Sequence, residues 1–484
     1  MMRLLMMVLG LAVVPQPVAL PVVHVVKTFP SLSGPNSADA GSTSADLSAA
    51  VSPKYLVTFI NAGMQVKRKT DGGDMQPPRT QMQFWTAALE NAGEKVQGKP
   101  YDPRISYDPM AARWFAASNE NINGLSHVLL FAASQDDDPT HPWKAVRYEV
   151  PMLIDNCKLA LDRYGFYTTS LGATRDPLAE VKTPVIAIPK ADLLWTGTAK
   201  PSLEHVNLFE VTGVPRMSDR KYNGNEGMVP AYDWDAGKAR TAPMYYVNRF
   251  RKEVDGETFL QIRTLTWDSP TKATLSGPVE IGLGEHYAVQ PTTMAVQPPA
   301  GEGLLSPGIR PGEARIVNAV VRNGRLYTIA AAQMGARAGA FWVEIELATM
   351  KLLQHGKLAD PALDILFPSI NVDRNGNIGL AMSATSATVY PSIYVTGRLK
   401  GDPPGTLRPL VRAVEGKYVH LRKTTDLQKP EQNESWSDFS TVILDSKDQS
   451  TFWTLQEATT NPTLPQEQNA DRFGTHWVAW KVGK

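Results

Sequence analysis

Short runs in which apolar and polar residues alternate recur along this chain, mostly in pairs separated by a brief polar turn. The first run of a pair ends at an Asp or another turn residue, and the second begins a few residues later. Alternation with a period of two is typical of β-strands that are buried on one face. The clearest pairs are 104–108 with 113–118, 369–373 with 377–383, and 440–445 with 451–455.

The runs form groups of four, and this recurrence of hairpins predicts an all-β fold, a β-propeller. We expect six blades, with seven as the alternative. The six groups span residues 104–150, 158–211, 229–281, 315–356, 369–421 and 440–482.

The last group has only three runs, whereas Tyr55–Ile60 reads as a strand with no hairpin partner nearby. We therefore expect this N-terminal strand to pair with the last group and close the ring. Closure of this kind removes two open sheet edges that would otherwise invite aggregation. It is the best argument for six blades.

The first residues resemble an export signal, with Arg3 followed by an apolar core from Leu4 to Val14. That core is too short to span a bilayer, which needs about 20 apolar residues. We expect a signal peptide at 1–25, a flexible Ser/Ala/Gly-rich linker at 26–53 and the propeller at 54–484. The protein would then be periplasmic or extracellular, with retention of the N-terminus as an anchor as the alternative, and the mature chain would have no transmembrane segment.

The composition argues against some classes of binding partner and against disulfide bonds. Lys plus Arg number 49 and Asp plus Glu 48, so no global charge recruits nucleic acid. Cys157 is the only cysteine, which excludes an internal disulfide. We expect it to be a structural thiol rather than a nucleophile, and we expect one helix, at 82–92, to pack at the rim.

Several segments together resemble a group of exported bacterial β-propeller proteins, many without an assigned function and some distantly similar to sialidase-type propellers. The segments are 101–108 with 113–115, 367–373, 391–397, and 436–440 with 451–453. In that group the segment at 436–440 usually reads Trp-Gly-Asp-Tyr-Ser. Here Ser437 replaces the Gly and Phe439 replaces the Tyr, so a role carried by that phenol is in doubt.

Polar residues at the starts of innermost strands should crowd the mouth of the axial channel. By this reasoning Asp102, Arg104, Ser369, Arg315 and Asp438 are candidates to bind a small polar ligand. The alternative is that they hydrogen-bond one another and hold the blades in register. Trp143 and Trp195 are assigned to loops and are candidate sugar-stacking platforms, whereas Trp114, Trp342, Trp453, Trp477 and Trp480 are expected in the core.

Motifs for other chemistry are weak. Residues 373–377 (Asp-Arg-Asn-Gly-Asn) resemble the opening of a calcium loop but lack its closing carboxylate, and a hairpin turn is favoured. The segment from Ser446 to Trp453 partly matches the Asp-box of sialidase-like propellers, itself a structural turn. No zinc, nucleophile-elbow or phosphate-loop motif is present. We therefore expect neither a metal nor another cofactor.

These observations predict an exported monomer that binds a carbohydrate or another extracellular ligand without catalysis. A sialidase-like glycoside hydrolase, or a lyase, on the same scaffold is the first alternative, because propellers host both binding and catalysis. Hydrolysis would need two carboxyl groups flanking the glycosidic bond. A scaffold that binds only protein partners is the second alternative.

Overall fold

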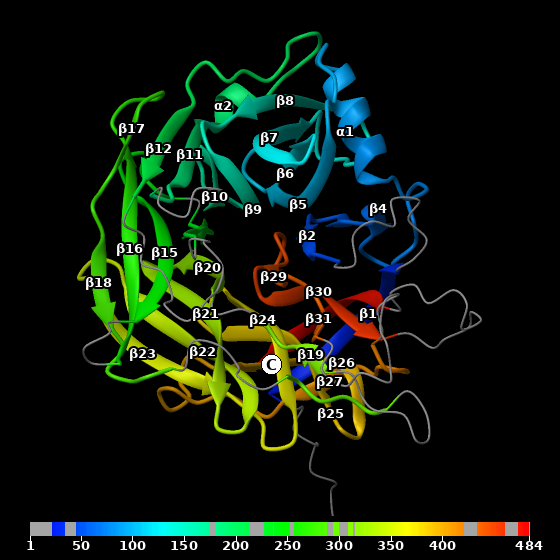
Figure 1. The fold of residues 1–484 in the computed structure, drawn as a ribbon, viewed down its shortest axis with the longest axis vertical. Coiled ribbons are helices and arrows are strands. Elements are labelled where there is room, and N and C mark those ends of the chain that lie inside the picture. Colours follow the sequence, from blue (N-terminus) through cyan, green and yellow to red (C-terminus); the bar gives the residue numbers. More distant parts are fainter. Residues whose placement is uncertain are drawn as a thin grey trace, which may run out of the picture.

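The computed structural model describes residues 22–33, 45–173, 180–212, 227–235, 237–251, 256–287, 294–299, 308–312, 315–420, 433–459 and 473–483. In this part of the chain the secondary structure is almost entirely β-strand, and seven sheets of three to five strands surround a common centre (Figure 1). We number these sheets as blades 1 to 7 in chain order.

The first four blades follow one another along the chain. Blade 1 consists of β2 (Ser48–Val51), β3 (Tyr55–Ile60) and β4 (Gly63–Arg68). Blade 2 consists of β5 (Lys99–Asp108), β6 (Arg113–Ile122), β7 (Leu125–Ser134) and β8 (Trp143–Glu149). Blade 3 consists of β9 (Leu153–Leu161), β10 (Gly165–Ala173), β11 (Thr183–Pro189) and β12 (Asn207–Val211). Blade 4 consists of β13 (Val229–Pro230), β15 (Met244–Arg251), β16 (Thr258–Trp267), β17 (Ala273–Leu275) and β18 (Val279–Gly282).

The last three blades complete the ring. Blade 5 consists of β14 (Tyr232–Asp233), which runs parallel to β20 (Ile316–Arg322), then β21 (Arg325–Met334), β22 (Arg337–Glu346) and β23 (Lys351–Leu358). Blade 6 consists of β24 (Asp364–Val372), β25 (Ile378–Ser386), β26 (Val389–Arg398) and β27 (Val411–Val414). Blade 7 consists of β29 (Thr441–Leu444), β30 (Thr451–Thr459), β31 (Phe473–Val482) and β1 (Val23–Ser33).

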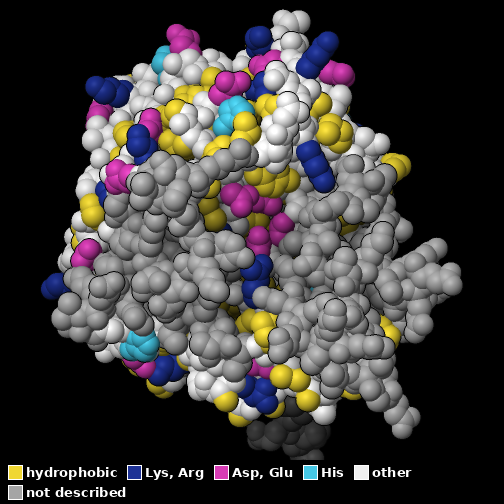
Figure 2. Space-filling model, viewed as in Figure 1, with side chains coloured by type: hydrophobic (Ala, Val, Ile, Leu, Met, Phe, Trp, Pro, Cys, Tyr) yellow, Lys and Arg dark blue, Asp and Glu magenta, His cyan; other side chains and the backbone are white. Residues whose placement is uncertain are grey.

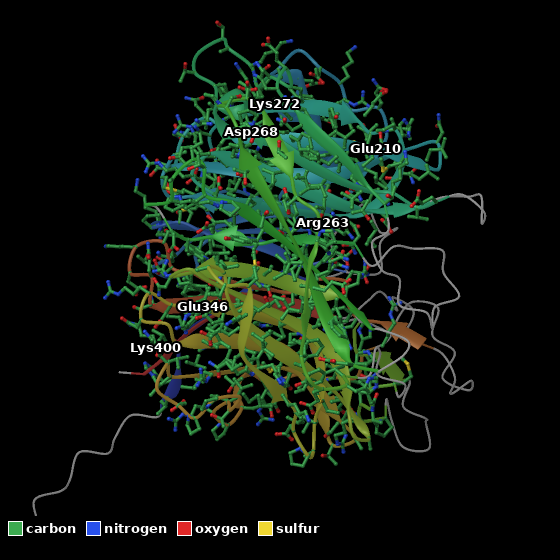
Figure 3. The ribbon with its side chains drawn as sticks, turned by 90° about the vertical axis from the view of Figure 1, so that its left-hand side faces the viewer. Glu210, Arg263, Asp268, Lys272, Glu346 and Lys400 are labelled. Carbon is green, nitrogen blue, oxygen red and sulfur yellow. The ribbon has the colours of Figure 1, made fainter. Side chains whose placement is uncertain are left out.

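The sheets radiate from an axis, as in a β-propeller. The innermost strands β2, β5, β9, β13, β20, β24 and β29 contact their neighbours in a closed circle, and all seven line one central cavity. Viewed from the side, blade 4 presents its outer edge, with Arg263 on β16 and with Asp268 and Lys272 at the β16–β17 turn (Figure 3). The all-β propeller prediction is confirmed, and seven blades, the alternative, is the correct number.

The prediction of six blades is wrong because blade 1 was not recognised. Ser48–Val51 is short and rich in small residues, so its composition resembles a linker. In the structure it is fully buried and pairs with Tyr55–Ile60, which pairs in turn with β4. The prediction that Tyr55–Ile60 closes the last group is therefore wrong as well.

An earlier strand closes the ring. β1 pairs antiparallel with β31, from Val23 opposite Val482 to Ser33 opposite Gly474. The segments 23–33 and 48–51 are thus ordered strands, so the prediction of a flexible linker over residues 26–53 is wrong in both places. As an outermost strand, β1 is half-exposed, so it lacks the strong apolar alternation of a core strand. Residues 1–21 lie outside the described part of the chain.

The cores of the propeller lie between adjacent blades. Phe115 and Phe131 of blade 2, for example, pack with Phe166 of blade 3. The five tryptophans assigned to the core are all buried, as predicted: Trp114, Trp342, Trp453, Trp477 and Trp480.

The predicted rim helix is present as α1 (Gln81–Glu90). Thr80 caps it in a capping box with Gln83, which satisfies the free amides of the first turn. Its buried side chains Phe84 and Trp85 reach Phe59 of blade 1, and Phe84 also reaches Trp143 of blade 2. The helix therefore bridges two blades. A second, one-turn helix, α2 (Lys190–Leu193), follows β11.

Aspartates recur where innermost strands turn into second strands, and lysines of the next blade bind them. Asp162 accepts hydrogen bonds from the amides of Tyr164 and Gly165 at 2.8 Å. Lys238 of the following segment lies 3.0 Å from Asp162 and 2.9 Å from Asp233. The same arrangement joins Lys190 to Asp108 and Lys69 to Asp445. These buried pairs hold neighbouring blades together at the end of the axis opposite the candidate site.

Candidate functional site

The candidate site lies where the innermost strands begin, at one mouth of the axial channel. Asp and Glu side chains gather with Lys and Arg side chains in the central hollow of this face (Figure 2). The described residues that form the cluster are Asp46, Asp102, Arg104, Asp155, Lys158, Arg315 and Asp438. They come from blades 1, 2, 3, 5 and 7.

A repeated backbone distortion aims these side chains. Asp46, Asp102, Asn156 and Phe367 have φ values of 48°, 50°, 57° and 41°, which non-glycine residues rarely adopt. In β5, β9 and β24 the register with the second strand shifts at this point. Such bulges commonly redirect side chains in strands. Two residues later the side chains of Ser48, Arg104, Lys158 and Ser369 follow, and the first three line the central cavity.

Four predicted residues converge at this mouth. Asp102 lies on β5 and is 5 % exposed. Asp438 and Arg315 line a small cavity beside Lys158. The backbone amide of Asp438 donates to the Asp46 carboxylate at 3.0 Å, and Arg310 lies 3.7 Å from the Asp438 side chain. The structure places these groups together, and ligand binding by them remains a prediction.

Ser369, the fifth residue of that set, holds the blades in register. Its hydroxyl accepts from the Val442 amide at 2.9 Å. Ser48 accepts from the Ile105 amide at 3.0 Å in the same way, and Arg104 Nε donates to the Cys157 carbonyl at 2.7 Å. The interpretation that these polar residues join neighbouring blades therefore applies to part of the cluster.

Burial disfavours charge on both acids and bases of the mouth. It raises the pKa of Asp102 well above its usual range, and the carboxylates of Asp46, Asp155 and Asp438 act in the same direction. The pKa of Asp155 is also raised, by burial despite the opposing charge of Arg315. Asp155 is exposed to solvent, so a ligand at the mouth can reach its carboxyl group.

Two cations share one aromatic ring. The Arg104 guanidinium lies 3.2 Å and the Lys158 ammonium 3.9 Å from the ring centroid of Phe439, which is 2 % exposed. Burial lowers the pKa of both cations, most strongly for Lys158. Arg104 Nη2 has no hydrogen-bond partner within the described ranges.

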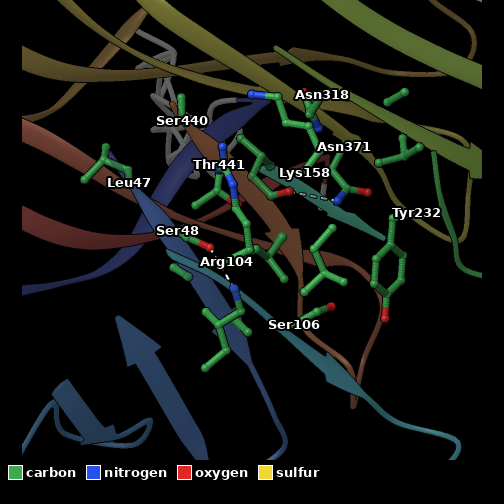
Figure 4. A pocket seen from close by; sticks show the side chains of 18 of the residues that line it. Leu47, Ser48, Arg104, Ser106, Lys158, Tyr232, Asn318, Asn371, Ser440 and Thr441 are labelled. Atoms are coloured by element: carbon green, nitrogen blue, oxygen red, sulfur yellow. Dashed lines mark hydrogen bonds between the residues drawn. The ribbon is translucent and has the colours of Figure 1, made fainter. Parts of the chain in front are cut away.

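The mouth continues into a central cavity of about 860 Å³. Arg104 and Lys158 extend toward the same end of it (Figure 4). Further along, the walls offer hydroxyl and amide groups from several blades: Ser48, Ser106, Asn318, Asn371, Ser440 and Thr441. A polar ligand could thus find both donors and acceptors below the charged mouth.

A parallel two-stranded ribbon lies beside the mouth. It consists of β19 (Gly308–Arg310) and β28 (Asn433–Ser435), contributed by two long interblade connections. Ile309 is buried in a small cluster with Phe367 and Trp436. The ribbon thereby carries Arg310 to Asp438.

The predicted surface platforms are wrong. Trp143 is the first residue of β8 and is 3 % exposed, and Trp195 is 5 % exposed. Their indole nitrogens donate to the carbonyls of Pro139 and Ala133. Burial follows from interblade packing that loop assignments by composition could not foresee, and neither ring can stack on a ligand.

Residues 373–377 form a turn that uses the carboxylate of Asp373 internally. It accepts from the amides of Asn375 and Asn377 at 2.8 Å. Asp448 likewise accepts from the amides of Ser450 and Thr451, so both segments are structural turns, as favoured. Within the described ranges no three His, Cys, Asp or Glu side chains are grouped to hold a metal.

Sequence reasoning missed several members of the mouth. Asp46 falls in the predicted linker, and Asp155 precedes the predicted strand. Lys158 lies on a predicted strand but is not among the predicted site residues, and Phe439 stands out in the sequence only because it replaces a Tyr. Arg104 and Lys158 occupy equivalent positions in their blades, each two residues after a residue with positive φ. This equivalence can be recognised in the sequence only when the starts of the innermost strands are aligned.

Cys157 is fully buried, its pKa is raised to about 12 by burial, and its thiol lies 3.1 Å from the Asp102 carbonyl oxygen. These features agree with a structural thiol.

No helix in the described part of the chain is long and apolar enough to cross a membrane. Protein-family models give no match to this sequence, and curated protein sequences give none either.

Three solved structures show distant similarity. A sialidase from Trypanosoma rangeli is 9 % identical, with a TM-score of 0.36; the match covers 89 % of this chain and 57 % of that one. The phage phi92 endosialidase is 7 % identical (TM-score 0.41, 91 % and 67 % covered). The Kuenenia stuttgartiensis hydrazine synthase is 8 % identical (TM-score 0.41, 88 % and 95 % covered). The chain thus spans little more than half of the trypanosomal protein. At these values the similarity supports no functional argument, and the fold assignment depends on the closed ring of sheets.

Proposed function

We propose that the protein binds a small carbohydrate, or a similar polyhydroxylated ligand, at the mouth formed by Asp155, Lys158, Arg315 and Asp438. The observation that carries this proposal is the convergence of carboxyl and cationic groups from several blades on an open cavity. Sugar hydroxyls both donate and accept hydrogen bonds, so they match a surface that presents nitrogen donors beside carboxyl oxygens. We also propose export of the protein, which the apolar N-terminal segment supports.

Binding is tested by a glycan array followed by calorimetry on the retained ligand. Asp155→Asn is the informative variant, because Asp155 is solvent-accessible and its loss leaves no buried charge unpaired. We expect it to weaken binding about tenfold or more, as loss of a charge-assisted hydrogen bond does. Glu210→Gln, an exposed carboxylate distant from the mouth, is the matched control. Equal affinity of both variants and the unmodified protein would contradict the proposed site.

Glycoside hydrolysis is the second candidate function, and the raised pKa of Asp155 favours it. Glycosidases use a carboxylic acid that holds its proton to protonate the leaving group, and a second carboxylate as base or nucleophile. Asp438, half-buried beside Arg315, is the candidate second group. Release of aryl alcohol from a panel of aryl glycosides, lost in Asp155→Asn, would support hydrolysis. Binding without turnover would exclude hydrolysis of that panel and leave carbohydrate binding.

A further inference from the structure

Lys158 occupies a distinctive position at the mouth. It lines both the central cavity and a smaller neighbouring cavity. Its ammonium lies on the face of Phe439, 3.9 Å from the ring centroid. A ligand in either cavity would therefore meet this amine.

The equivalent positions of other blades use their side chains to bind the next blade. Ser48, Arg104 and Ser369 each hydrogen-bond the backbone of the next innermost strand. Asn318 in β20 bonds both the amide and the carbonyl of Ile370. Lys158 departs from this pattern, because its ammonium donates to Asn156 of its own strand. No carboxylate of the described residues lies at ion-pair distance from it.

The charges around Lys158 favour a neutral amine. Burial acts most strongly, and the guanidinium groups of Arg104 and Arg315 add to it. Asp102 and Asp438 act in the opposite direction but do not compensate, so the pKa lies well below its ordinary 10.5. A lysine desolvated beside another cation is one of the known ways to obtain a nucleophilic amine in a protein.

We propose that Lys158 Nζ is a nucleophilic amine that forms an imine with an aldehyde or 2-oxo acid bound at the mouth. The nitrogen lone pair attacks the carbonyl carbon and gives a carbinolamine; after proton transfer the hydroxyl leaves as water and a C=N bond forms. Arg104 lines the central cavity and Arg315 the smaller one, each together with Lys158, and a guanidinium is well suited to bind the carboxylate of a 2-oxo acid. This chemistry shares the mouth with the proposed carbohydrate site but does not depend on it.

The test uses the full chain, glyoxylate as the carbonyl probe and cyanoborohydride to trap the imine as a secondary amine. Peptide mapping by mass spectrometry then reports the modification of every lysine in one sample. Lys144 is the internal control, because its ammonium also lies over an aromatic ring (Trp195, 4.3 Å) but donates to the carbonyls of Gly197 and Ala199. Lys272 represents an exposed lysine.

At pH 7 we expect Lys158 to react at least about tenfold faster than Lys272, because a lysine of ordinary pKa is almost entirely protonated there. Its rate should level off at lower pH than that of Lys272, and Lys158→Arg, checked for an unchanged melting temperature, should lose only this modification. Reaction of Lys158 no faster than that of Lys272 or Lys144 would overturn the proposal.

Propionaldehyde, which lacks a carboxylate, tests recognition by the guanidiniums. Faster reaction of Lys158 with glyoxylate than with propionaldehyde supports recognition of the carboxylate by the guanidiniums. Equal rates with the two probes overturn that recognition but not the proposal that Lys158 is a reactive amine. Failure of the glycan array would not affect either result, so the two proposals fail separately.

Discussion

Replacement of Lys238 tests whether the buried ion pairs hold the blades together. Lys238 is 9 % exposed, and the side chains of its partners Asp162 and Asp233 are 2 % and 4 % exposed. Lys238→Met would leave two adjacent buried carboxylates without a counter-charge. Removal of one partner of a buried pair typically costs about 3–5 kcal/mol. The Lys238 ammonium lies at ion-pair distance from both carboxylates but makes no well-aligned hydrogen bond. We therefore expect Lys238→Met to lower the free energy of unfolding by about 3 kcal/mol, the lower end of this range.

The stability lost in Lys238→Met should depend on pH, and the pKa shifts of Lys238 and Asp233 give the direction. Burial opposes the charge of Lys238, but Asp162 and Asp233 outweigh it and raise its pKa above 10.5. Its contribution to stability is therefore complete below pH 10.5 and is lost as the pH rises through the folded-state value. Burial raises the pKa of Asp233 above 3.8 even against Lys238. Without Lys238 this carboxyl should take up a proton more readily, so the variant's deficit should be larger at pH 8 than at pH 5.

Urea denaturation followed by tryptophan fluorescence measures these differences at both pH values. Lys182→Met is the matched control, because Lys182 pairs with Glu210 at the surface, and we expect no measurable change. Addition of Asp233→Asn to Lys238→Met should restore part of the loss. A Lys238→Met protein within about 1 kcal/mol of the unmodified one, less than breaking a buried pair normally costs, would refute the reasoning.

Three further predictions concern single elements. Removal of residues 1–33 should expose the edge of β31 and cause self-association, measured by size-exclusion chromatography; a stable monomer would contradict closure by β1. Thr80→Ala should cost about 1 kcal/mol in urea denaturation through loss of the α1 capping box, whereas Thr271→Ala, in an exposed turn, should cost less. Phe439→Ala should lower the free energy of unfolding by about 3–5 kcal/mol, because this buried ring supports Arg104 and Lys158. An unchanged midpoint of urea denaturation would show that the two cations do not need the ring.

Much of the propeller could be predicted from the sequence because most of its strands pair with strands adjacent in the sequence. The six groups from 104 to 482 correspond to blades 2 to 7, since each hairpin carries its own alternation and turn residues. Asn323-Gly324, for example, adopts φ values of 52° and 69° between β20 and β21, as its turn sequence predicts. The helix at 82–92 was readable for the same reason, as a local amphipathic pattern.

Contacts distant in sequence decided the rest. Two strands have only a weak alternation of apolar and polar residues, Val23–Ser33 and Ser48–Val51. The first is a strand because it pairs with β31, and the second because it is buried at the axis. The mouth residues were only partly predictable: strand starts pointed to Asp102, Arg104, Arg315 and Asp438. The proximity of Asp46, Asp155, Lys158 and Phe439 depends on ring closure. Ring closure sets the desolvation and the charge neighbours of these groups, and these properties arise between blades rather than within a segment.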